Sequence, residues 1–596
     1  MRTERVMLWL SGVIPAFAAA LHTVNVADAA HDEGVIRAVG FGWTGVWRSL
    51  DAVVAAAAMV LPIGTRSLRA GLACALLVGV AGVVVYELAR RLLAACAASA
   101  GPQRLGAVVA LLASLTTTLG ATWQLEAASP GGAVLGALLA LAPALALMHD
   151  GHATASRAPL TAGLLGLAFG YEPLVGVCAL ASSGALALVE WTTDPPRVTP
   201  LARRRLAWTS AILFCAGLVP LGLGALRART ARGLALGVPA MTSWTGEHGA
   251  SAKGTPLAFA ESELGWVVVA LAVVGATLAM FAPRARAIAA ALIVLTGVGL
   301  ASVALGVPAG PTRFGGPVLA AVAASFALAA IAMQAIVRGV ATAKIPFARA
   351  SAAMIVVLEL TLPVHVADDA LGRSMDRARG VAATWEAVAW GPLPAGAVLM
   401  ISDPRVMKRI VAERAAGTMR GDVLVVPTYD LSGAIARAAL TQEPRLAPFW
   451  RDMALLTAPD EFSLSTLAAT RPLVMAFDPR WEKALARHLV PVGLVARFET
   501  EPRGASDRRR ALDGFVTKRD RLMKETVILR DPELVALTAQ LLRARAIALA
   551  ASGDRDMVIR GIDDLHVFSP YDTVADTLAH RAAVTRGPVD VKDLRP

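Results

Sequence analysis

Two adjacent carboxylates, Asp32 and Glu33, follow the first apolar segment of the chain and come directly after His31. At the edge of a membrane span, such a pair can take a proton from an acceptor hydroxyl group, or it can hold a divalent cation against a lipid diphosphate. The alternative interpretation is that both side chains only solvate a loop. We predict Asp32 and Glu33 as catalytic residues, with a divalent metal ion as a candidate cofactor.

Three further residues are candidates for substrate binding. Glu126 lies at the end of one apolar segment, Glu172 interrupts another, and Trp47 precedes a short apolar run. Each can line a cavity at the same membrane surface as the acidic pair, although polar and aromatic side chains are also common at headgroup level. The four cysteines lie in or beside apolar runs without ligand spacing, so no metal-binding motif is predicted.

The composition indicates a membrane protein with a soluble end. Of the 596 residues, 56% are hydrophobic and only 17% are charged, whereas a soluble globular chain has about 25% charged residues. More than half of the Lys and Arg residues lie after position 370, where the composition becomes that of a soluble domain. The net charge of +12 includes no basic run interleaved with aromatic residues, so no binding of nucleic acid is predicted.

Residues 1–370 are predicted to form a transmembrane domain of about eleven spans, because a helix needs about 20 apolar residues to cross a bilayer. The segment 160–190 is too long for one span and is broken at Glu172, so it is read as two short helices. The run 51–63 is too short and is predicted to lie in the membrane interface. The other spans are expected near 7–24, 68–88, 105–123, 131–148, 208–225, 264–281, 287–305, 315–337 and 348–366.

The bias of Lys and Arg among the loops predicts an orientation. With the N-terminus in the cytoplasm, the inner loops hold most of the positive charge. The long loops 25–67 and 226–263 then lie outside, and an odd number of spans places the C-terminal domain outside as well. We predict a multi-pass protein of the bacterial inner membrane, with its tail in the periplasm.

The tail is predicted to contain two segments. In residues 371–505, short apolar runs alternate with helical patterns, which indicates a small α/β layer fold with a partly parallel sheet. Its strands are expected at 397–401, 423–426, 473–477 and 494–498. In residues 506–596 the pattern is helical, with one helix from Asp531-Pro532 to Ser552-Gly553, and the helix pairs resemble a tetratricopeptide hairpin.

Several motifs, in this order along the chain, resemble a bacterial membrane-protein family of unknown function. That family is related to the GT-C glycosyltransferases, which use polyprenol-linked sugars, and it is similar to protein O-mannosyltransferases. The resemblance implies a GT-C fold, a lipid-linked sugar donor, and an acid in the first outer loop that acts as a catalytic base or binds a metal; Asp32 and Glu33 occupy that place. The motifs are Asp32–Gly64 with its Leu-Pro-Ile-Gly end, Gly166–Leu174, Leu393–Asp403, Arg420–Val426 and Arg471–Phe498.

The chain departs from the family pattern at two places. Family members have a stretch like His-Pro-Pro-Gly in the first outer loop, where this chain reads Gly45-Val46-Trp47-Arg48, and Glu172 replaces the usual polar residue between the paired helices. Two function classes therefore stay open. One is an integral membrane glycosyltransferase that moves a sugar from a polyprenyl carrier to an extracytoplasmic acceptor, and the other is a non-catalytic membrane scaffold that presents a periplasmic interaction domain.

Overall fold

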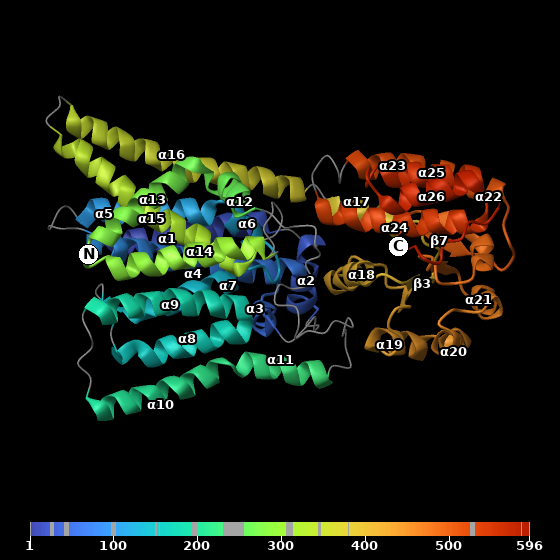
Figure 1. Ribbon diagram of the computed structural model, residues 1–596, viewed down its shortest axis with the longest axis horizontal. Helices are drawn as coiled ribbons and strands as arrows, with labels where there is room; N and C mark the ends of the chain where they lie inside the picture. Colours follow the sequence, from blue (N-terminus) through green and yellow to red (C-terminus); the bar gives the residue numbers. More distant parts are fainter. Residues whose placement is uncertain are drawn as a thin grey trace.

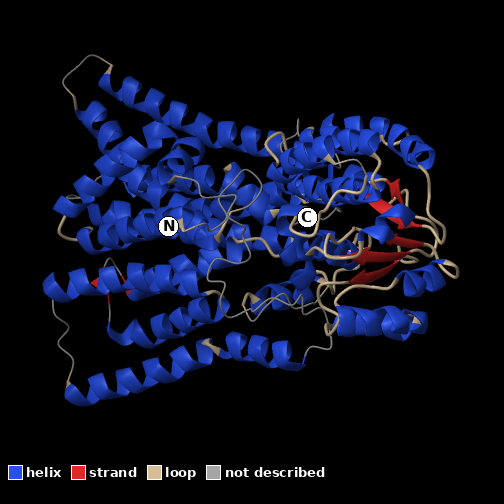
Figure 2. Ribbon diagram, turned by 45° about the vertical axis from the view of Figure 1, so that its right-hand side comes forward, coloured by secondary structure: helices blue, strands red, loops and turns tan. Residues whose placement is uncertain are grey.

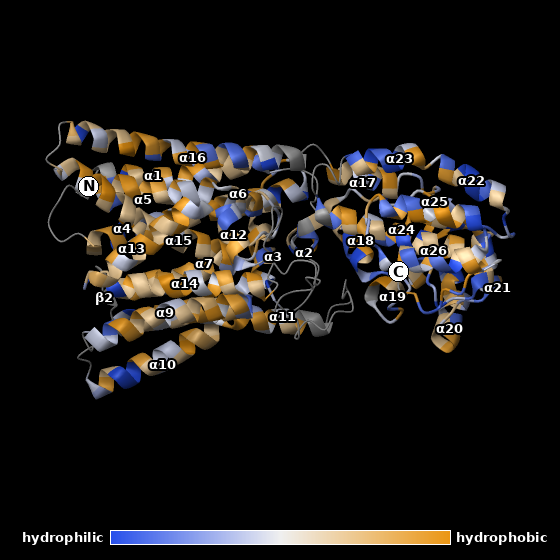
Figure 3. Ribbon diagram, turned by 45° about the horizontal axis from the view of Figure 1, so that its top comes forward, coloured by the Kyte–Doolittle hydropathy of each residue, from blue (hydrophilic) through white to orange (hydrophobic). Residues whose placement is uncertain are grey.

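The computed structural model consists of a bundle of long helices at one end and a smaller α/β domain at the other (Figure 1). Residues 2–594 are described, except 24–28, 41–46, 97–102, 150–151, 154, 194–198, 231–254, 306–313, 344–346, 379–380, 525–530 and 586. The two ends differ in hydropathy, because the bundle is coloured mostly as hydrophobic and the α/β domain shows many hydrophilic helix faces (Figure 3). The predicted class, a helical membrane protein followed by a small α/β and helical domain, is confirmed.

The bundle is built around one central helix. α15 (Gly316–Thr342) is apolar and 83% of its most apolar stretch is buried, and it packs against α5, α7, α13, α14 and α16. The other long helices are α1 (Arg2–His22), α4 (Arg66–Cys96), α5 (Gln103–Leu119), α7 (Val134–Leu147), α8 (Ala158–Tyr171), α9 (Pro173–Thr193), α10 (Pro200–Gly217), α13 (Gly265–Phe281), α14 (Arg286–Ala304) and α16 (Ala348–Ala378).

The described residues contain eight helices that are long and apolar enough to cross a membrane, or up to ten when two bent pairs count as spans. The bent pairs join α5 to α6 (Ala121–Ala127) at 59° and α12 (Pro256–Glu263) to α13 at 103°. The prediction of about eleven spans also included α7 and α8, which have only 14 residues each. One of the eight, α24 (Pro532–Ser552), was predicted to be a soluble helix and does pack within the α/β domain.

Small residues allow the bundle helices to approach one another closely. A Cβ atom on Gly166 of α8 would lie 2.1 Å from the carbonyl oxygen of Phe214 in α10, and one on Gly275 would lie 1.9 Å from the carbonyl oxygen of Leu328. Close backbone packing at small residues is the usual basis of helix association in lipid, where apolar side chains gain nothing by leaving the surrounding tails. The glycines therefore fix how α8 and α13 pack.

Three short helices lie at the end of the bundle nearest the α/β domain (Figure 1). They are α2 (Asp32–Ala38), α3 (Ser49–Ala58) and α11 (Val219–Thr230), and α3 packs against the other two and against α4. α3 is the short helix that was predicted for the run 51–63. The two long loops that were predicted on one outer surface contribute α2, α3 and part of α11 to this junction.

The α/β domain holds a five-stranded sheet in the order β4-β3-β5-β7-β6 (Figure 2). β3 (Val398–Ile401) pairs in parallel with β4 (Leu424–Pro427) and β5 (Leu473–Met475), and β7 (Val495–Phe498) is antiparallel to β5 and β6 (Leu489–Val492). The predicted partly parallel sheet is present, with β6 in addition. α17 (Val381–Ala389) precedes β3. The helices between the strands are α18 (Pro404–Ala416), α19 (Ala434–Gln442), α20 (Ala447–Leu456) and α21 (Glu461–Ala468).

The helical end of the chain shares one hydrophobic core with this sheet. It consists of α22 (Ala505–Asp513), α23 (Val516–Leu522), α24, α25 (Arg555–His566) and α26 (Thr573–Val584). α24 begins at its N-cap Asp531 and ends before Gly553, which has φ +92°, as its start and stop signals predicted. The boundary at 505 and the tetratricopeptide-like character remain predictions.

Candidate functional site: a charged junction at the end of the bundle

The short helix α2 places the predicted catalytic pair against the α/β domain. Asp32 is 4% exposed, and its Oδ1 accepts a hydrogen bond from Arg409 of α18 at 2.8 Å. Glu33 binds Lys408 of α18 at 3.1 Å through Oε1 and Arg37 at 3.4 Å through Oε2. Both carboxylates therefore form ion pairs with basic residues of the C-terminal domain, Asp32 with Arg409 and Glu33 with Lys408.

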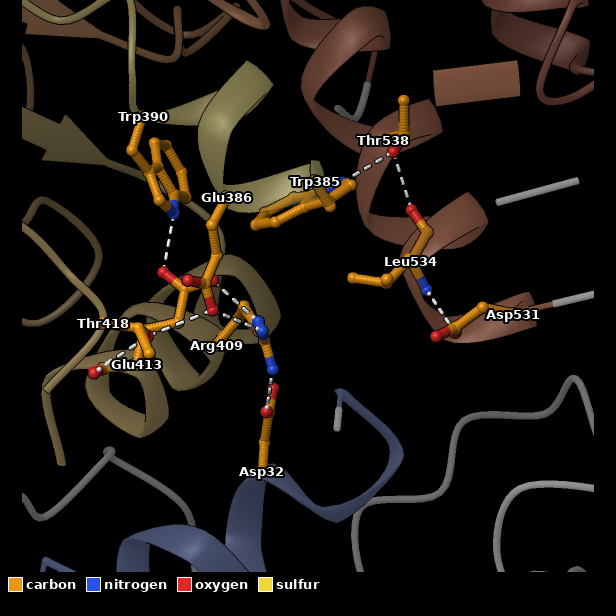
Figure 4. A network of polar contacts seen from close by, with 10 residues as sticks. All are labelled: Asp32, Trp385, Glu386, Trp390, Arg409, Glu413, Thr418, Asp531, Leu534 and Thr538. Carbon is orange, nitrogen blue, oxygen red and sulfur yellow. Dashed lines mark hydrogen bonds and ion pairs between the residues drawn. The ribbon is translucent and has the colours of Figure 1, made fainter. Parts of the chain in front are cut away.

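Arg409 is fully buried and binds three carboxylates (Figure 4). Besides Asp32, it donates to Glu386 of α17 at 2.9 Å and to Glu413 of its own helix at 2.7 Å. Burial, together with the nearby charges of Glu386 and Asp32, raises the pKa of Glu413 to about 8 against the opposing effect of Arg409. The indole of Trp390 donates to the same carboxyl group at 2.6 Å. This network joins the first loop to the α/β domain.

A second charged cluster lies on the membrane side of α2, around Asp51. The hydroxyl of Tyr171 donates to Asp51 Oδ1 at 2.9 Å and accepts from Arg48 Nε at 2.9 Å. The guanidinium groups of Arg48 and Arg37 lie 3.3 and 3.4 Å from Asp51 Oδ2. Asp51 is 5% exposed, so the cluster buries two positive charges, one carboxylate and one phenol at the end of the bundle.

An unusual backbone conformation at Arg48 directs its side chain into this cluster. Arg48 has φ +61°, a left-handed conformation that is uncommon for residues other than glycine and that tertiary contacts must hold in place. Its amide donates to the carbonyl of Tyr171 at 2.8 Å, and its side chain donates to the carbonyls of Gly131 and Gly132 at 2.9 and 3.2 Å. Burial lowers the pKa of Arg48, but the charges of Tyr171, Asp51 and Glu172 raise it well above the ordinary value.

A small cavity with room for about one water molecule lies beside Asp51. Its walls come from α2, α3, α4, α7 and the 131–132 turn, and they are apolar apart from Asp51 and the thiol of Cys74.

The three predicted substrate-binding residues lie at different places. Glu126 is 1% exposed and accepts hydrogen bonds from the amides of Phe314 at 2.6 Å and Ala133 at 2.8 Å, with His31 at 3.0 Å. Glu172 follows Tyr171 at the break between α8 and α9, and it is close enough to Arg48 to raise the pKa of that guanidinium. Trp47 is half-buried and precedes Arg48. The structure thus places Glu172 and Trp47 beside the Asp51 cluster, while Glu126 joins the loop to α15.

Sequence reasoning missed Arg37, Arg48 and Asp51 as site residues. A signal was present, because these are the three charged residues between Glu33 and Arg66 in an otherwise uncharged stretch. Charged groups that interrupt an apolar run near a membrane need partners, and here they are partners of one another. Within the described part of the chain, no three His, Cys, Asp or Glu side chains come together in a way that could hold a metal ion.

The fold and the junction define a polytopic helical membrane protein in which α2, after the first span, packs between the bundle and a C-terminal α/β domain. It is similar to the crystal structure of ArnT from Cupriavidus metallidurans in the apo state, with a TM-score of 0.49 and 16% identity over 83% of this chain and 97% of that one. The structure of the same protein bound to undecaprenyl phosphate gives a TM-score of 0.43 and 16% identity over 79% and 91%.

No family model and no curated protein sequence matches the chain. Because both TM-scores lie below 0.5, the function proposed next rests on the residues of this chain and on the motifs in its sequence.

Proposed function

We propose that this protein is a GT-C-like membrane glycosyltransferase that transfers a sugar from a polyprenyl-linked donor to an extracytoplasmic acceptor. The observation that carries the proposal is the buried cluster of Arg37, Arg48, Asp51 and Tyr171, next to a cavity at the end of the bundle. The cluster combines the two chemical properties that such a reaction needs at one membrane boundary, namely positive charge for a phosphate and a carboxylate for a proton.

The arginines suit the leaving group. In the reaction, an acceptor hydroxyl oxygen bonds to the anomeric carbon of the sugar, and the bond from that carbon to the phosphate oxygen breaks. The phosphate keeps the electron pair, and a guanidinium group stabilises the resulting charge by paired hydrogen bonds. Arg48 now donates hydrogen bonds to a phenol and to two carbonyls, which are neutral acceptors, and its anionic partner is Asp51 at 3.3 Å. A phosphate can offer it paired charge-assisted hydrogen bonds instead.

The carboxylate suits the acceptor. A phosphate that binds Arg48 or Arg37 would replace Asp51 as the partner of that guanidinium, and Asp51 could then accept the proton of the attacking hydroxyl. Asp32 and Glu33, the predicted catalytic pair, are the alternative candidates for this general base. Activity measurements on variants of Asp51, Asp32 and Glu33 distinguish the two possibilities.

The test is transfer from radiolabelled polyprenyl-phosphate sugars by the purified full-length protein in lipid nanodiscs. We expect Asp51→Asn to lower kcat by about 100-fold or more, and Arg48→Lys to weaken the binding of the polyprenyl phosphate itself. Asp478→Asn is the matched control, because Asp478 is a buried, arginine-paired aspartate of the α/β domain. Wild-type activity in Asp51→Asn together with its loss in Asp32→Asn or Glu33→Gln would assign the base to the predicted pair.

The predicted alternative is a non-catalytic scaffold. The specific observation in its favour is that Asp32 and Glu33, the carboxylates at the family's catalytic position, form ion pairs with Arg409 and Lys408. If the wild-type protein neither binds polyprenyl phosphate nor changes the surface glycans of its host, while it remains folded, the scaffold is the better description.

A further inference from the structure

We propose that the α/β domain holds the active site in its working geometry, because Lys408 and Arg409 position α2 and, through it, the Arg37–Asp51 pair. They would be positioning residues and would not contact the substrate. This inference rests on the proposed function, and it assigns a role in the reaction to a domain that lies beyond the membrane spans.

The first argument is that α2 is packed into the core of the α/β domain. Val35, Ile36 and Val39 are fully buried, and they belong to the same hydrophobic cluster as the sheet strands and α18. An interface that continues a domain core is characteristic of permanent contacts rather than transient ones. The first outer loop therefore contributes structure to a domain that follows it by more than 350 residues.

The second argument is that α2 is wedged on its other side against the bundle. A Cβ atom on Gly34 would lie 2.3 Å from the carbonyl oxygen of Pro130 and 3.0 Å from that of Gly131. Gly131 is also the residue whose carbonyl accepts the hydrogen bond of Arg48. A shift of α2 would therefore move the turn that holds Arg48.

The third argument is a continuous series of charged contacts from the α/β domain to the cavity. Lys408 Nζ lies 3.1 Å from Glu33 Oε1, and Glu33 Oε2 lies 3.4 Å from Arg37 Nη1. Arg37 Nε lies 3.4 Å from Asp51 Oδ2, and Asp51 lines the cavity. A neighbouring ion pair of 2.8 Å, between Arg409 and Asp32, holds the first turn of α2 in place. Each group in the series sets the position of the next one.

The experiment needs the domain to stay docked while the positioning contacts are removed, and the structure offers a way to achieve this. A Cβ atom on Gly40 would lie 2.9 Å from the Cβ of Ala415 in α18, shorter than the separation of about 3.5–4.5 Å in a disulfide, so the chain at Gly40 must move away from α18 by about 1 Å to form one. Gly40→Cys with Ala415→Cys should lock α2 to α18 after oxidation. Each single cysteine variant controls for the four native cysteines.

We expect the oxidised, disulfide-locked protein to transfer sugar as the unlocked protein does. In the same locked background, Lys408→Gln or Arg409→Gln should lower kcat on the order of 10- to 100-fold, with little change in the KM for the donor. Lys408→Arg and Arg409→Lys should restore part of the rate. Wild-type kcat in the locked Gln variants would overturn the inference, because the lysine and arginine would then serve only to dock the domain. Loss of activity on locking, recovered on reduction, would also overturn it, because docking would then be inhibitory.

The two proposals fail differently. If wild-type protein transfers sugar and Asp51→Asn does not, the proposed function stands and the locked variants decide the role of the α/β domain alone. If wild-type protein neither binds polyprenyl phosphate nor transfers sugar, both proposals are wrong.

Discussion

Replacing Arg409 and replacing Asp32 break the same ion pair, but the two substitutions leave different groups behind. In Arg409→Gln, the carboxyl groups of Asp32, Glu386 and Glu413 lose the cation that they share. In Asp32→Asn, Arg409 keeps Glu386 at 2.9 Å and Glu413 at 2.7 Å. We therefore predict an asymmetric effect on stability.

The size of the asymmetry follows from burial. Removing one partner of a buried ion pair costs about 3–5 kcal/mol when the other charge is left unpaired, and this applies to Arg409→Gln because Arg409 is fully buried. Asp32→Asn removes a single charge-assisted hydrogen bond, which is worth about 1.5–3 kcal/mol. The deficit of Arg409→Gln should also narrow as the pH falls, because Glu386 and Glu413, whose pKa values burial raises, can take up protons.

The assay is thermal unfolding of the full-length protein in detergent, followed by tryptophan fluorescence. Trp385 and Trp390 lie beside the network and report on it (Figure 4). Arg560→Gln is the control, because Arg560 and its partner Asp513 are 46% and 57% exposed and their ion pair should contribute little. A midpoint for Asp32→Asn equal to or below that of Arg409→Gln, at neutral pH, would refute this account of the network.

Three further predictions concern other buried groups. The pKa of Glu413 is about 8 in the folded protein, well above the ordinary value for a glutamate. Between these two pKa values, Glu413 keeps its proton in the folded state and loses it in the unfolded chain. Stability should fall by at most roughly 1 kcal/mol per pH unit up to about pH 8, and thermal midpoints of Glu413→Gln measured across pH 5–9 should lack this decline. Gly34→Ala should destabilise the protein by about 1–3 kcal/mol, because its Cβ would meet the Pro130 carbonyl oxygen at 2.3 Å, whereas Gly421→Ala, with nothing within 4 Å, should leave the midpoint unchanged. Glu126→Ala should lower the midpoint by an amount corresponding to about 2–5 kcal/mol, because two buried amides and a histidine lose their acceptor, and a midpoint within 1 °C of wild type would contradict this.

Local structure could largely be predicted from the sequence, because its signals are local. Asp531-Pro532 and Ser552-Gly553 mark the ends of α24, and short apolar runs mark four of the five strands. The fifth strand, β6, contains Pro491 and only alternate residues are buried, so it lacks the continuous apolar run of the central strands. The span near 208–225 lies within one apolar stretch long enough to cross a membrane, Pro200–Leu226, although α10 ends at Gly217 and α11 continues from Val219.

The partners of the first-loop residues could not be predicted, because they lie far away in the sequence. Asp32 and Arg409 are 377 positions apart, and Tyr171 is 120 positions from Asp51. Periodicity indicates that a carboxylate lies near a membrane surface, but it carries no information on which cation from another domain will face it. The sequence therefore indicated that Asp32 and Glu33 follow the first span, but it did not indicate that they pair with Arg409 and Lys408 of α18.

The packing of α2 into the α/β domain has a consequence for how the protein is made. Val35, Ile36 and Val39 are synthesised early and are buried by strands and helices that follow by about 360 residues. Until the C-terminal segment has been translated and has reached the same side of the membrane, these apolar side chains have no native surface to cover them. Chains arrested before residue 398, where β3 begins, should therefore be held by chaperones or degraded even when all their spans are inserted, so completion of the membrane part waits for the last part of the chain.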